Sequence, residues 1–330
     1  MAKHEAYELK QMQSLPLKYK ILMSQQRIQD WYEYWNGEVY ISFSGGVNST
    51  VLLYLVRELY PDVVAVFCDT GLEYPEIREF VKTFDNVVWL KPKKNFKQII
   101  KEKGYPVLSK NISHNVGIAK RNPEGNVMTN LFNPDKKGKY AFARYRFLID
   151  APFNVSDVCC NYLKKEPAHR YSKETGKKAI LGIMAEESEM RKDQWMKHGC
   201  NAFDLKHPQS SPLSFWTQND MLQYLYETKK PYCSVYGDIV IDETKTDEML
   251  GQISFDERTL PLTTTGCKRT GCMYCLFGIH REKSPNRLEQ MKITHPKTYG
   301  YIMKSELEGG LNYKFVIDWL NEHGNLNIKY

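Results

Sequence analysis

The feature that most constrains this chain is a glycine pair set between two apolar runs in residues 39–60. VYISFS (39–44) predicts a buried strand, and STVLLYLVRELY (49–60) predicts a helix. The glycines between them let the backbone approach an anion closely, and the first turn of a helix offers unpaired N–H groups. The segment therefore predicts a phosphate-binding loop, with an ordinary capped turn as the alternative. The candidate ligands are Ser44, Gly45, Gly46, Asn48, Ser49 and Thr50.

Three more apolar runs predict strands of the same sheet. They are VVAVFCDTG (63–71), NVVWLKP (86–92) and AILGIMA (179–185), and helical segments separate them. Strands that alternate with helices are typical of a doubly wound parallel sheet, so we expect an α/β fold. Residues 16–36 carry apolar side chains at helical spacing and predict an amphipathic helix packed on this domain.

The remaining segments suggest how the chain is divided. Residues 103–150 are rich in Lys, Arg, Asn and Gly with weak periodicity, so we expect an insertion that is mobile or ordered by substrate, with a helix near 140–150. The strand pattern fades after about residue 235, and the tail after 284 looks helical. We expect an N-terminal helical segment (1–36), a nucleotide-binding domain (37–235) and a C-terminal cysteine-cluster and helical region (236–330).

Composition excludes several classes of protein. The 330 residues are 42% hydrophobic and 26% charged, which is typical of a globular protein rather than a disordered one. The chain has no apolar run of about eighteen residues and no apolar secretory segment at its start, so we expect a cytoplasmic protein that does not enter a membrane. The formal net charge of +7 fits phosphate-bearing partners, either a nucleotide or a nucleic acid.

The cysteines form two groups that are far apart in the sequence. Cys159 and Cys160 are adjacent, and Cys267, Cys272 and Cys275 lie close together downstream. In a reducing compartment such cysteines favour metal binding over structural disulfides. Thiolates ligate iron–sulfur clusters, and four of them suit tetrahedral zinc equally well, so spacing alone leaves both open. The isolated Cys68, Cys200 and Cys233 are interpreted as buried or incidental.

The loop and four further segments resemble one family. FSGGVNSTVLL is similar to the SGGxDS phosphate loop of the N-type ATP pyrophosphatases, in particular the phosphoadenosine phosphosulfate (PAPS) reductase branch. FCDTGLEYPE matches that branch's second loop, GIMAEESEMR matches the element after its fourth strand, and PLSFWTQNDMLQYL matches the segment before its cysteines. The resemblance covers about residues 35–280 and implies a Rossmann-like ATP pyrophosphatase fold with a C-terminal iron–sulfur region.

The same resemblance implies ligands for the nucleotide and for a metal. The nucleotide would be ATP or adenosine (phospho)sulfate, bound by the loop together with Asp69, Thr70, Gly71, Glu187 and Ser188. Asp69 would help hold Mg²⁺, and Arg191 and Lys110 would clamp anionic groups as catalytic residues. Iron–sulfur adenylylsulfate reductases pair a Cys-Cys with a distant CxxC, which gives Cys159, Cys160, Cys272 and Cys275 as ligands of a 4Fe–4S cluster, with Cys267 as an alternate and Zn²⁺ as the competing metal.

Two positions depart from the family pattern. Asn48 stands where the family usually has Asp, and it lacks the negative charge that helps to hold Mg²⁺. Met184 stands where the family's first substrate arginine is usual. We therefore expect slow ATP cleavage, if the nucleotide is ATP.

The sequence after Cys275 contains no cysteine, whereas reductases of the family end in a mobile tail whose cysteine attacks the bound sulfonucleotide. This difference favours an enzyme of nucleotide-dependent sulfur transfer or adenylation, acting on tRNA or DNA with a cysteine desulfurase or a thiol reductant as partner. The first alternative is a phosphoadenylyl- or adenylyl-sulfate reductase that uses an external thiol. The second is a catalytically weak module that binds nucleotide or nucleic acid within a larger assembly.

Overall fold

The computed structural model describes residues 3–135, 142–245 and 260–330. The described parts form two compact units that interleave along the chain. The first unit comprises Met1–Asp69, Glu73–Lys91 and Pro167–Gly271, and the second comprises Thr70–Leu72, Pro92–Glu166 and Cys272–Tyr330. The predicted division at residues 36 and 235 remains a prediction, because compactness does not show which segments fold independently.

A six-stranded sheet forms the centre of the first unit, in the order β3-β2-β1-β5-β7-β6. Its strands are β1 (Val39–Ser42), β2 (Ala65–Cys68), β3 (Val87–Leu90), β5 (Lys178–Leu181), β6 (Asn201–Ala202) and β7 (Gln209–Ser210). All neighbouring pairs are parallel except β6 and β7. The four strands predicted from the sequence are all present, and the α/β class with a mostly parallel sheet is confirmed.

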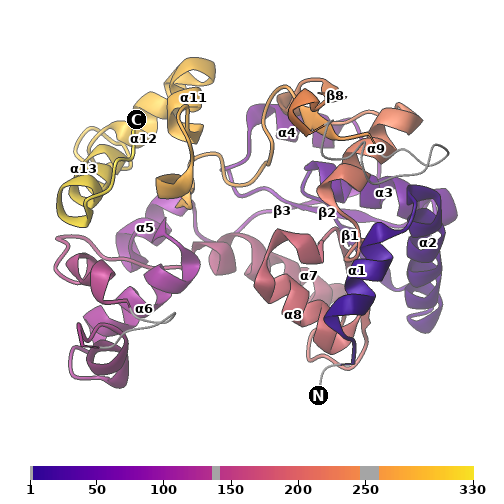
Figure 1. Cartoon of the computed structure of the whole chain (residues 1–330), viewed down its shortest axis with the longest axis horizontal. Helices are drawn as coiled ribbons and strands as arrows, with labels where there is room; N and C mark the ends of the chain where they lie inside the picture. The colour runs from indigo at the N-terminus through magenta and orange to yellow at the C-terminus, as the bar shows by residue number, and fades with distance from the viewer. Residues whose placement is uncertain (1–2, 136–141, 246–259) are drawn as a thin grey trace. The chain divides into compact units, whose positions relative to one another are not determined.

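Helices surround this sheet because each has an apolar face. α2 (Leu17–Tyr34), predicted over residues 16–36, packs against α3 (Val47–Leu59), and Figure 1 shows the two next to the strands. Ile28 and Trp31 of α2 are fully buried in the core of this unit. The buried Lys20 ammonium lies 2.7 Å from the Asp220 carboxylate of α9, so an ion pair also joins α2 to α9 (Gln218–Thr228).

The other elements of the first unit are shorter. Its further helices are α1 (Ala6–Ser14), α4 (Pro75–Lys82), α7 (Glu166–Thr175) and α8 (Glu189–His198), and its single 3-10 turns are η4 (Ala185–Glu187), η5 (Ser234–Tyr236) and η6 (Glu243–Lys245). A two-stranded antiparallel pair, β8 (Ile239–Ile241) and β9 (Leu262–Thr264), follows η5. Tyr236 precedes this pair and Thr270 follows it, and both side chains lie at the phosphate loop.

The second unit is mainly helical. Its elements are α5 (Phe96–Lys103), β4 (Val107–Leu108), α6 (Lys110–Arg121), η1 (Val127–Leu131), η2 (Ala143–Leu148), η3 (Asn161–Lys165), β10 (Leu276–Phe277), η7 (Ile279–Arg281), α11 (Arg287–Thr294), α12 (Pro296–Met303) and α13 (Tyr313–Gly324). The tail after residue 284 is helical, as predicted, and α12 contacts both α11 and α13 (Figure 1). β4 pairs with β10 in parallel, which joins residues 107–108 to residues 276–277.

Residues 103–150 contain more regular structure than their weak periodicity predicted. The described part contains the helix α6, which Ser109 caps by accepting a hydrogen bond from the Ile112 N–H. That the insertion is mobile or ordered by substrate stays a prediction. Buried Ile112 and Val116 hold the helix against the rest of the second unit. The helix predicted near 140–150 is the 3-10 helix η2 at Ala143–Leu148, and residues 136–141 lie outside the described part. Separately, no helix in the described residues is long and apolar enough to cross a membrane.

Candidate functional site

The predicted phosphate loop connects β1 to the start of α3. Gly46 occupies the cap position before Val47, the first helical residue, so the loop backbone faces the unpaired N–H groups of this helix. Gly45 has φ +72°, in the left-handed region that favours glycine. The Ser49 hydroxyl lies 3.0 Å from the Ser44 hydroxyl and accepts the Ser44 N–H at 3.1 Å, which fixes the turn. The loop is therefore built as the sequence predicted.

The loop lies where the order in which strands are added to the sheet reverses. The chain runs from β1 through β2 to β3 on one side, and later adds β5 on the other side of β1. Ligands of open α/β sheets bind beyond the carboxyl ends of the strands at such a switch point. Gly182, directly after β5, reaches the loop: a Cβ there would lie 2.9 Å from the Asn48 carbonyl oxygen. Only glycine permits this close approach of backbone to backbone.

Two hydroxyl groups cover the loop. The Tyr236 hydroxyl accepts a hydrogen bond from the Val47 N–H at 3.1 Å and lies 2.6 Å from the Thr270 hydroxyl. A Cβ on Gly46 would lie 2.8 Å from the Thr270 hydroxyl and 3.2 Å from that of Tyr236. Both residues belong to the first unit, and neither was predicted from the sequence.

Three charged side chains of the first unit, Glu187, Arg191 and Arg269, lie in contact. Glu187 forms an ion pair with Arg191 and accepts a hydrogen bond of 2.7 Å from Arg269. Burial, followed by the nearby Arg269 charge, lowers the pKa of Arg191 below its usual value. The trio carries one net positive charge, which favours an anionic ligand. The Ser188 hydroxyl, predicted to bind nucleotide, accepts the Arg191 N–H and caps α8.

Asp69, Thr70 and Gly71 follow β2. One carboxylate oxygen of Asp69 accepts a hydrogen bond of 3.0 Å from Arg78 on α4, and this carboxylate is largely buried. The Thr70 hydroxyl accepts the Leu72 N–H at 3.2 Å, and Gly71 turns the chain with φ +74°. The structure thus gives Asp69 a cationic partner within the first unit.

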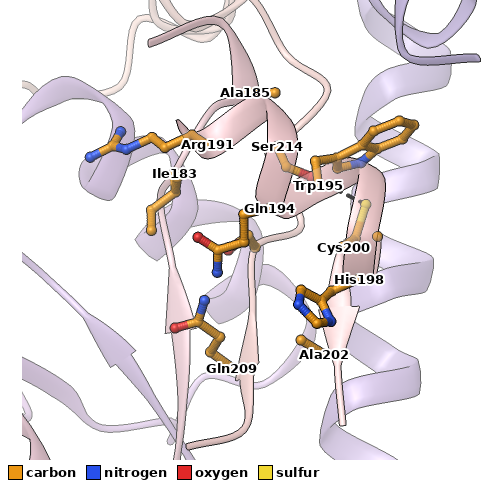
Figure 2. A pocket seen from close by; sticks show the side chains of 12 residues that line it. Ile183, Ala185, Arg191, Gln194, Trp195, His198, Cys200, Ala202, Gln209 and Ser214 are labelled. Atoms are coloured by element: carbon orange, nitrogen blue, oxygen red, sulfur yellow. Dashed lines mark hydrogen bonds between the residues drawn. The ribbon is translucent and has the colours of Figure 1, made fainter. Parts of the chain in front are cut away.

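A small pocket lies beside α8 in the first unit (Figure 2). In it, the Ser214 hydroxyl donates to the Cys200 sulfur at 3.3 Å, and Trp195 lies close by, while Arg191 extends away from these side chains (Figure 2). No residue of the 44–50 loop lines this pocket. It is therefore distinct from the phosphate loop.

Four of the five predicted metal-ligating cysteines share the second unit: Cys159, Cys160, Cys272 and Cys275. A hydrogen bond from the Cys159 thiol lowers the pKa of Cys160 to about 5, and the Lys110 and Lys164 ammonium groups act in the same direction. The same hydrogen bond, with burial, raises the pKa of Cys159. Burial also raises the pKa of Cys275, which feels the charge of Cys160. The segments from 159–160 and 272–275 therefore come together in this unit.

Tyr313 lies among these cysteines. Its side chain is fully buried, and its hydroxyl has no hydrogen-bond partner among the described residues. Burial raises its pKa well above the usual value, with further contributions from Cys275, Cys159 and Cys272. Its ring meets that of Tyr274, inside the CxxC segment, edge-on at 6.1 Å. A buried donor without an acceptor beside three thiols fits an anionic group that is held by the cysteines.

The described residues contain no formed binding site for a single metal ion. No group of three or more His, Cys, Asp or Glu side chains in the described residues is placed to hold one. Cys267, the predicted alternate ligand, belongs to the first unit, and its thiol donates to the Arg269 carbonyl at 2.9 Å.

Comparison with known proteins identifies the family. The sequence profile of the phosphoadenosine phosphosulfate reductase domain matches residues 38–110 and 87–276, well over half of the chain. The chain belongs to this family.

Curated relatives match over shorter stretches. An uncharacterized protein of Methanocaldococcus jannaschii is 37% identical over 87 residues, which are 24% of this chain and 21% of the relative. A phosphoadenosine 5′-phosphosulfate reductase of Serratia proteamaculans is 35% identical over 60 residues, 18% of this chain and 25% of the relative. An adenosine 5′-phosphosulfate reductase of Geobacillus kaustophilus is 25% identical over 202 residues, 61% of this chain and 68% of the relative. The chain thus spans a quarter or less of the first two relatives.

Among solved structures, the PAPS reductase of Candida auris in complex with phosphate matches 70% of this chain and 90% of its own chain, with 16% identity and a TM-score of 0.38.

Within the PAPS reductase family, the two departures from the usual pattern have different surroundings. Asn48 is partly exposed at the start of α3, where its backbone carbonyl touches Gly182. Met184 is almost fully buried in the core of the first unit. Lys110, expected to act with Asp69 and Arg191, belongs to the second unit, where its ammonium group lowers the pKa of Cys160.

Proposed function

We propose that this member of the PAPS reductase family is a sulfonucleotide reductase that uses an external dithiol. An adenosine phosphosulfate binds through its phosphate to the Ser44–Thr50 loop. A thiolate of the dithiol attacks the sulfonate sulfur, the bond from sulfur to the phosphate oxygen breaks, and AMP leaves. The second thiol then attacks the sulfonated thiol, so that a disulfide forms and sulfite is released. The sulfur gains the two electrons that the dithiol loses.

The carboxylates of the first unit carry this proposal. Mg²⁺ is bound in enzymes through carboxylates and substrate phosphates. Here Asp69 pairs with Arg78, Glu187 pairs with two arginines, and Asn48 is uncharged. Breaking these pairs to bind a metal costs free energy, whereas an anionic sulfonucleotide gains from Arg191 and Arg269 directly. The arrangement therefore favours a nucleotide reaction that needs no metal at the phosphate loop over one that uses MgATP.

We propose further that the second unit holds a 4Fe–4S cluster, with zinc as the alternative metal. Cys159, Cys160, Cys272 and Cys275 would hold it, and a bound cluster would supply negative charge and electron-rich sulfur in this unit. The Lys110 and Lys164 side chains would offset that charge, because both are close enough to Cys160 to lower its pKa. The buried Tyr313 hydroxyl would donate a hydrogen bond to a cluster or cysteine sulfur.

The second candidate function is ATP-dependent sulfur transfer to a nucleic acid. The net charge of +7 favours it, because a positively charged protein attracts the phosphates of a nucleic acid. In this reaction ATP adenylates an oxygen of tRNA or DNA, pyrophosphate leaves, and sulfur from a desulfurase displaces AMP. Asp69 would then have to release Arg78 to hold Mg²⁺. A module that only binds nucleotide or nucleic acid is the remaining alternative.

Product analysis separates these functions. Anaerobically purified protein is incubated with adenosine 5′-phosphosulfate, with its 3′-phosphorylated form, or with ATP, Mg²⁺ and tRNA or DNA. The proposal expects AMP or adenosine 3′,5′-bisphosphate together with sulfite, only when a dithiol is present. Pyrophosphate from ATP without sulfite from either sulfonucleotide would establish the second candidate instead, and binding without any product would establish the third.

A further inference from the structure

Tyr236 and Thr270 stand where a phosphate would bind. The Val47 N–H is the first backbone donor of α3, and the Tyr236 hydroxyl oxygen accepts it at 3.1 Å. The Thr270 hydroxyl holds that oxygen from the other side at 2.6 Å. A backbone N–H has a single hydrogen, so it cannot donate fully to the tyrosine and to a phosphate at once. One donor of the phosphate loop is therefore already taken.

The space above the loop is also filled. A single added carbon on Gly46 would lie 2.8 Å from the Thr270 hydroxyl, which is shorter than a normal contact. A phosphate group is larger than that carbon and needs the same face of the loop. A phosphate that contacts Gly46 and Val47 must therefore displace both hydroxyls.

The two hydroxyls belong to segments that are joined to each other. The Gly266 N–H donates to the Tyr236 carbonyl at 2.8 Å, and the Cys267 N–H donates to the Val235 carbonyl at 2.9 Å. A Cβ on Gly266 would lie 2.5 Å from the Val235 carbonyl oxygen, so the two backbones are in direct contact. Tyr236 and the segment that carries Thr270 are therefore expected to move together.

We propose that the Tyr236–Thr270 hydroxyl pair competes with nucleotide phosphate for the start of α3 and so sets the affinity of the site. The inference rests on the proposed function, because it assumes that nucleotide binds at this loop. Binding exchanges the Tyr236 oxygen for a phosphate oxygen at the Val47 N–H and moves Tyr236 and Thr270 away from Gly46. The cost of this exchange lowers the affinity of every ligand that carries a phosphate, and leaves unphosphorylated adenosine unaffected.

Isosteric variants of the full-length protein test the competition. Tyr236→Phe removes the competing oxygen and keeps the ring, and Thr270→Val removes the hydroxyl that holds it. Tyr232→Phe is the matched control, because the Tyr232 hydroxyl likewise accepts a backbone N–H, that of Ile239 at 3.2 Å, which does not belong to the loop. Calorimetry with AMP, adenosine 5′-phosphosulfate and adenosine measures the three variants and the wild type.

Tyr236→Phe should bind AMP and adenosine 5′-phosphosulfate about two- to tenfold more tightly than the wild type, the value of one net hydrogen bond. Thr270→Val should show a smaller gain, Tyr232→Phe none, and adenosine no change in any variant. The melting temperature should rise more on addition of AMP in Tyr236→Phe than in the wild type, which provides a second readout.

Unchanged or weaker phosphate binding by both Tyr236→Phe and Thr270→Val, with the wild type binding normally, would overturn the competition and leave the proposed function standing. A gain that extends equally to adenosine would also overturn it. If neither the wild type nor any variant bound a nucleotide, the proposed function would fail and the inference would fail with it.

Discussion

The phosphate loop is built from one continuous segment of the chain, whereas the group of four cysteines is built from two distant segments. The loop is made from seven consecutive residues, and local geometry positions them: a left-handed glycine at 45, a serine pair and a helix start. The cysteines come from two segments more than a hundred residues apart and meet only because the second unit folds around them. A site built from one segment can be recognised from residues alone, whereas a site built from distant segments needs a family resemblance or a structure.

The comparison predicts that a substitution in one region abolishes ligand binding there and leaves ligand binding in the other region intact. Cys272→Ala or Cys275→Ala should remove the proposed iron–sulfur cluster altogether, since each removes one of its four proposed thiolate ligands. Anaerobically purified wild type should contain about four iron and four sulfide per chain, and these variants should contain almost none. Metal analysis and the visible absorption spectrum measure this.

Cys267→Ala is the control for the cluster, because the Cys267 thiol donates to the Arg269 carbonyl at 2.9 Å, and its loss should leave the iron content unchanged. Nucleotide binding should persist in all three cysteine variants. One zinc and no iron in the wild type would refute the cluster, and loss of iron in Cys267→Ala would make that residue a ligand.

Gly46→Val changes the phosphate loop and leaves the cysteines untouched. The added carbons collide with the Thr270 and Tyr236 hydroxyls and deny phosphate its backbone contacts, so nucleotide affinity should fall about a hundredfold or more. The iron content should not change. Gly300→Val is the control, since nothing lies within 4 Å of a Cβ there. Calorimetry that finds wild-type affinity in Gly46→Val would place the nucleotide elsewhere.

Asn48→Asp restores the residue that the family usually has in this loop, and so tests what the departure changes. The restored carboxylate should recruit Mg²⁺ and raise pyrophosphate release from ATP, which should be slow in the wild type, by on the order of a hundredfold at most. Without Mg²⁺ the same charge should repel the phosphates and weaken binding. The assay compares both proteins with Mg²⁺ and with a chelator, in the presence of tRNA or DNA. Fast wild-type release that the substitution leaves unchanged or lowers would show that another residue holds the metal.

Arg191 and Arg269 should differ because their exposure differs. The Arg191 side chain is 34% exposed and that of Arg269 is 67% exposed, although both contact Glu187. Arg191→Ala should weaken adenosine 5′-phosphosulfate binding about ten- to a hundredfold, as expected for a partly buried charged hydrogen bond. Arg269→Ala should cost about fivefold or less. Equal losses in the two variants would mean that neither guanidinium is the specific clamp.

The smallest expected effect lies in the cluster region. Tyr313→Phe should retain the full iron content, because it removes no ligand. Loss of the buried hydroxyl donor should shift the cluster's reduction potential to a more negative value. Redox titration followed by absorbance measures the shift, with Tyr105→Phe as control, since the Tyr105 hydroxyl already donates to the Leu311 carbonyl at 3.0 Å. An unchanged potential would place the Tyr313 hydroxyl away from the cluster.

Sequence reasoning predicted the features that are local. The strands, α2 and the Ser44–Thr50 loop follow from hydrophobic periodicity and glycine placement. Helix α6 was missed although its signal was present: Ser109 at the cap position, followed by Ile112 and Val116 at helical spacing. Gly182 was noted only as part of a motif, and its contact with Asn48 required the structure.

Tyr236 and Thr270 could not have been found in this way. They lie almost two hundred residues or more from the loop that they cover, and no residue pattern links either of them to it. Lys110, which the family resemblance grouped with Asp69 and Arg191, belongs to the unit that holds the cysteines, and its role as a clamp stays a prediction. Side chains that act across long sequence separations are specified by tertiary packing, which residue patterns do not encode directly.

The ratio of products from adenosine 5′-phosphosulfate tests the central claim most directly. Iron-loaded wild-type protein is given this nucleotide and an excess of dithiol under anaerobic conditions, and AMP and sulfite are quantified over time. The account predicts that the two products form in a one-to-one ratio, that both require the dithiol, and that Gly46→Val forms neither. AMP with sulfate in place of sulfite, or no turnover by iron-loaded protein that binds the nucleotide, would contradict it.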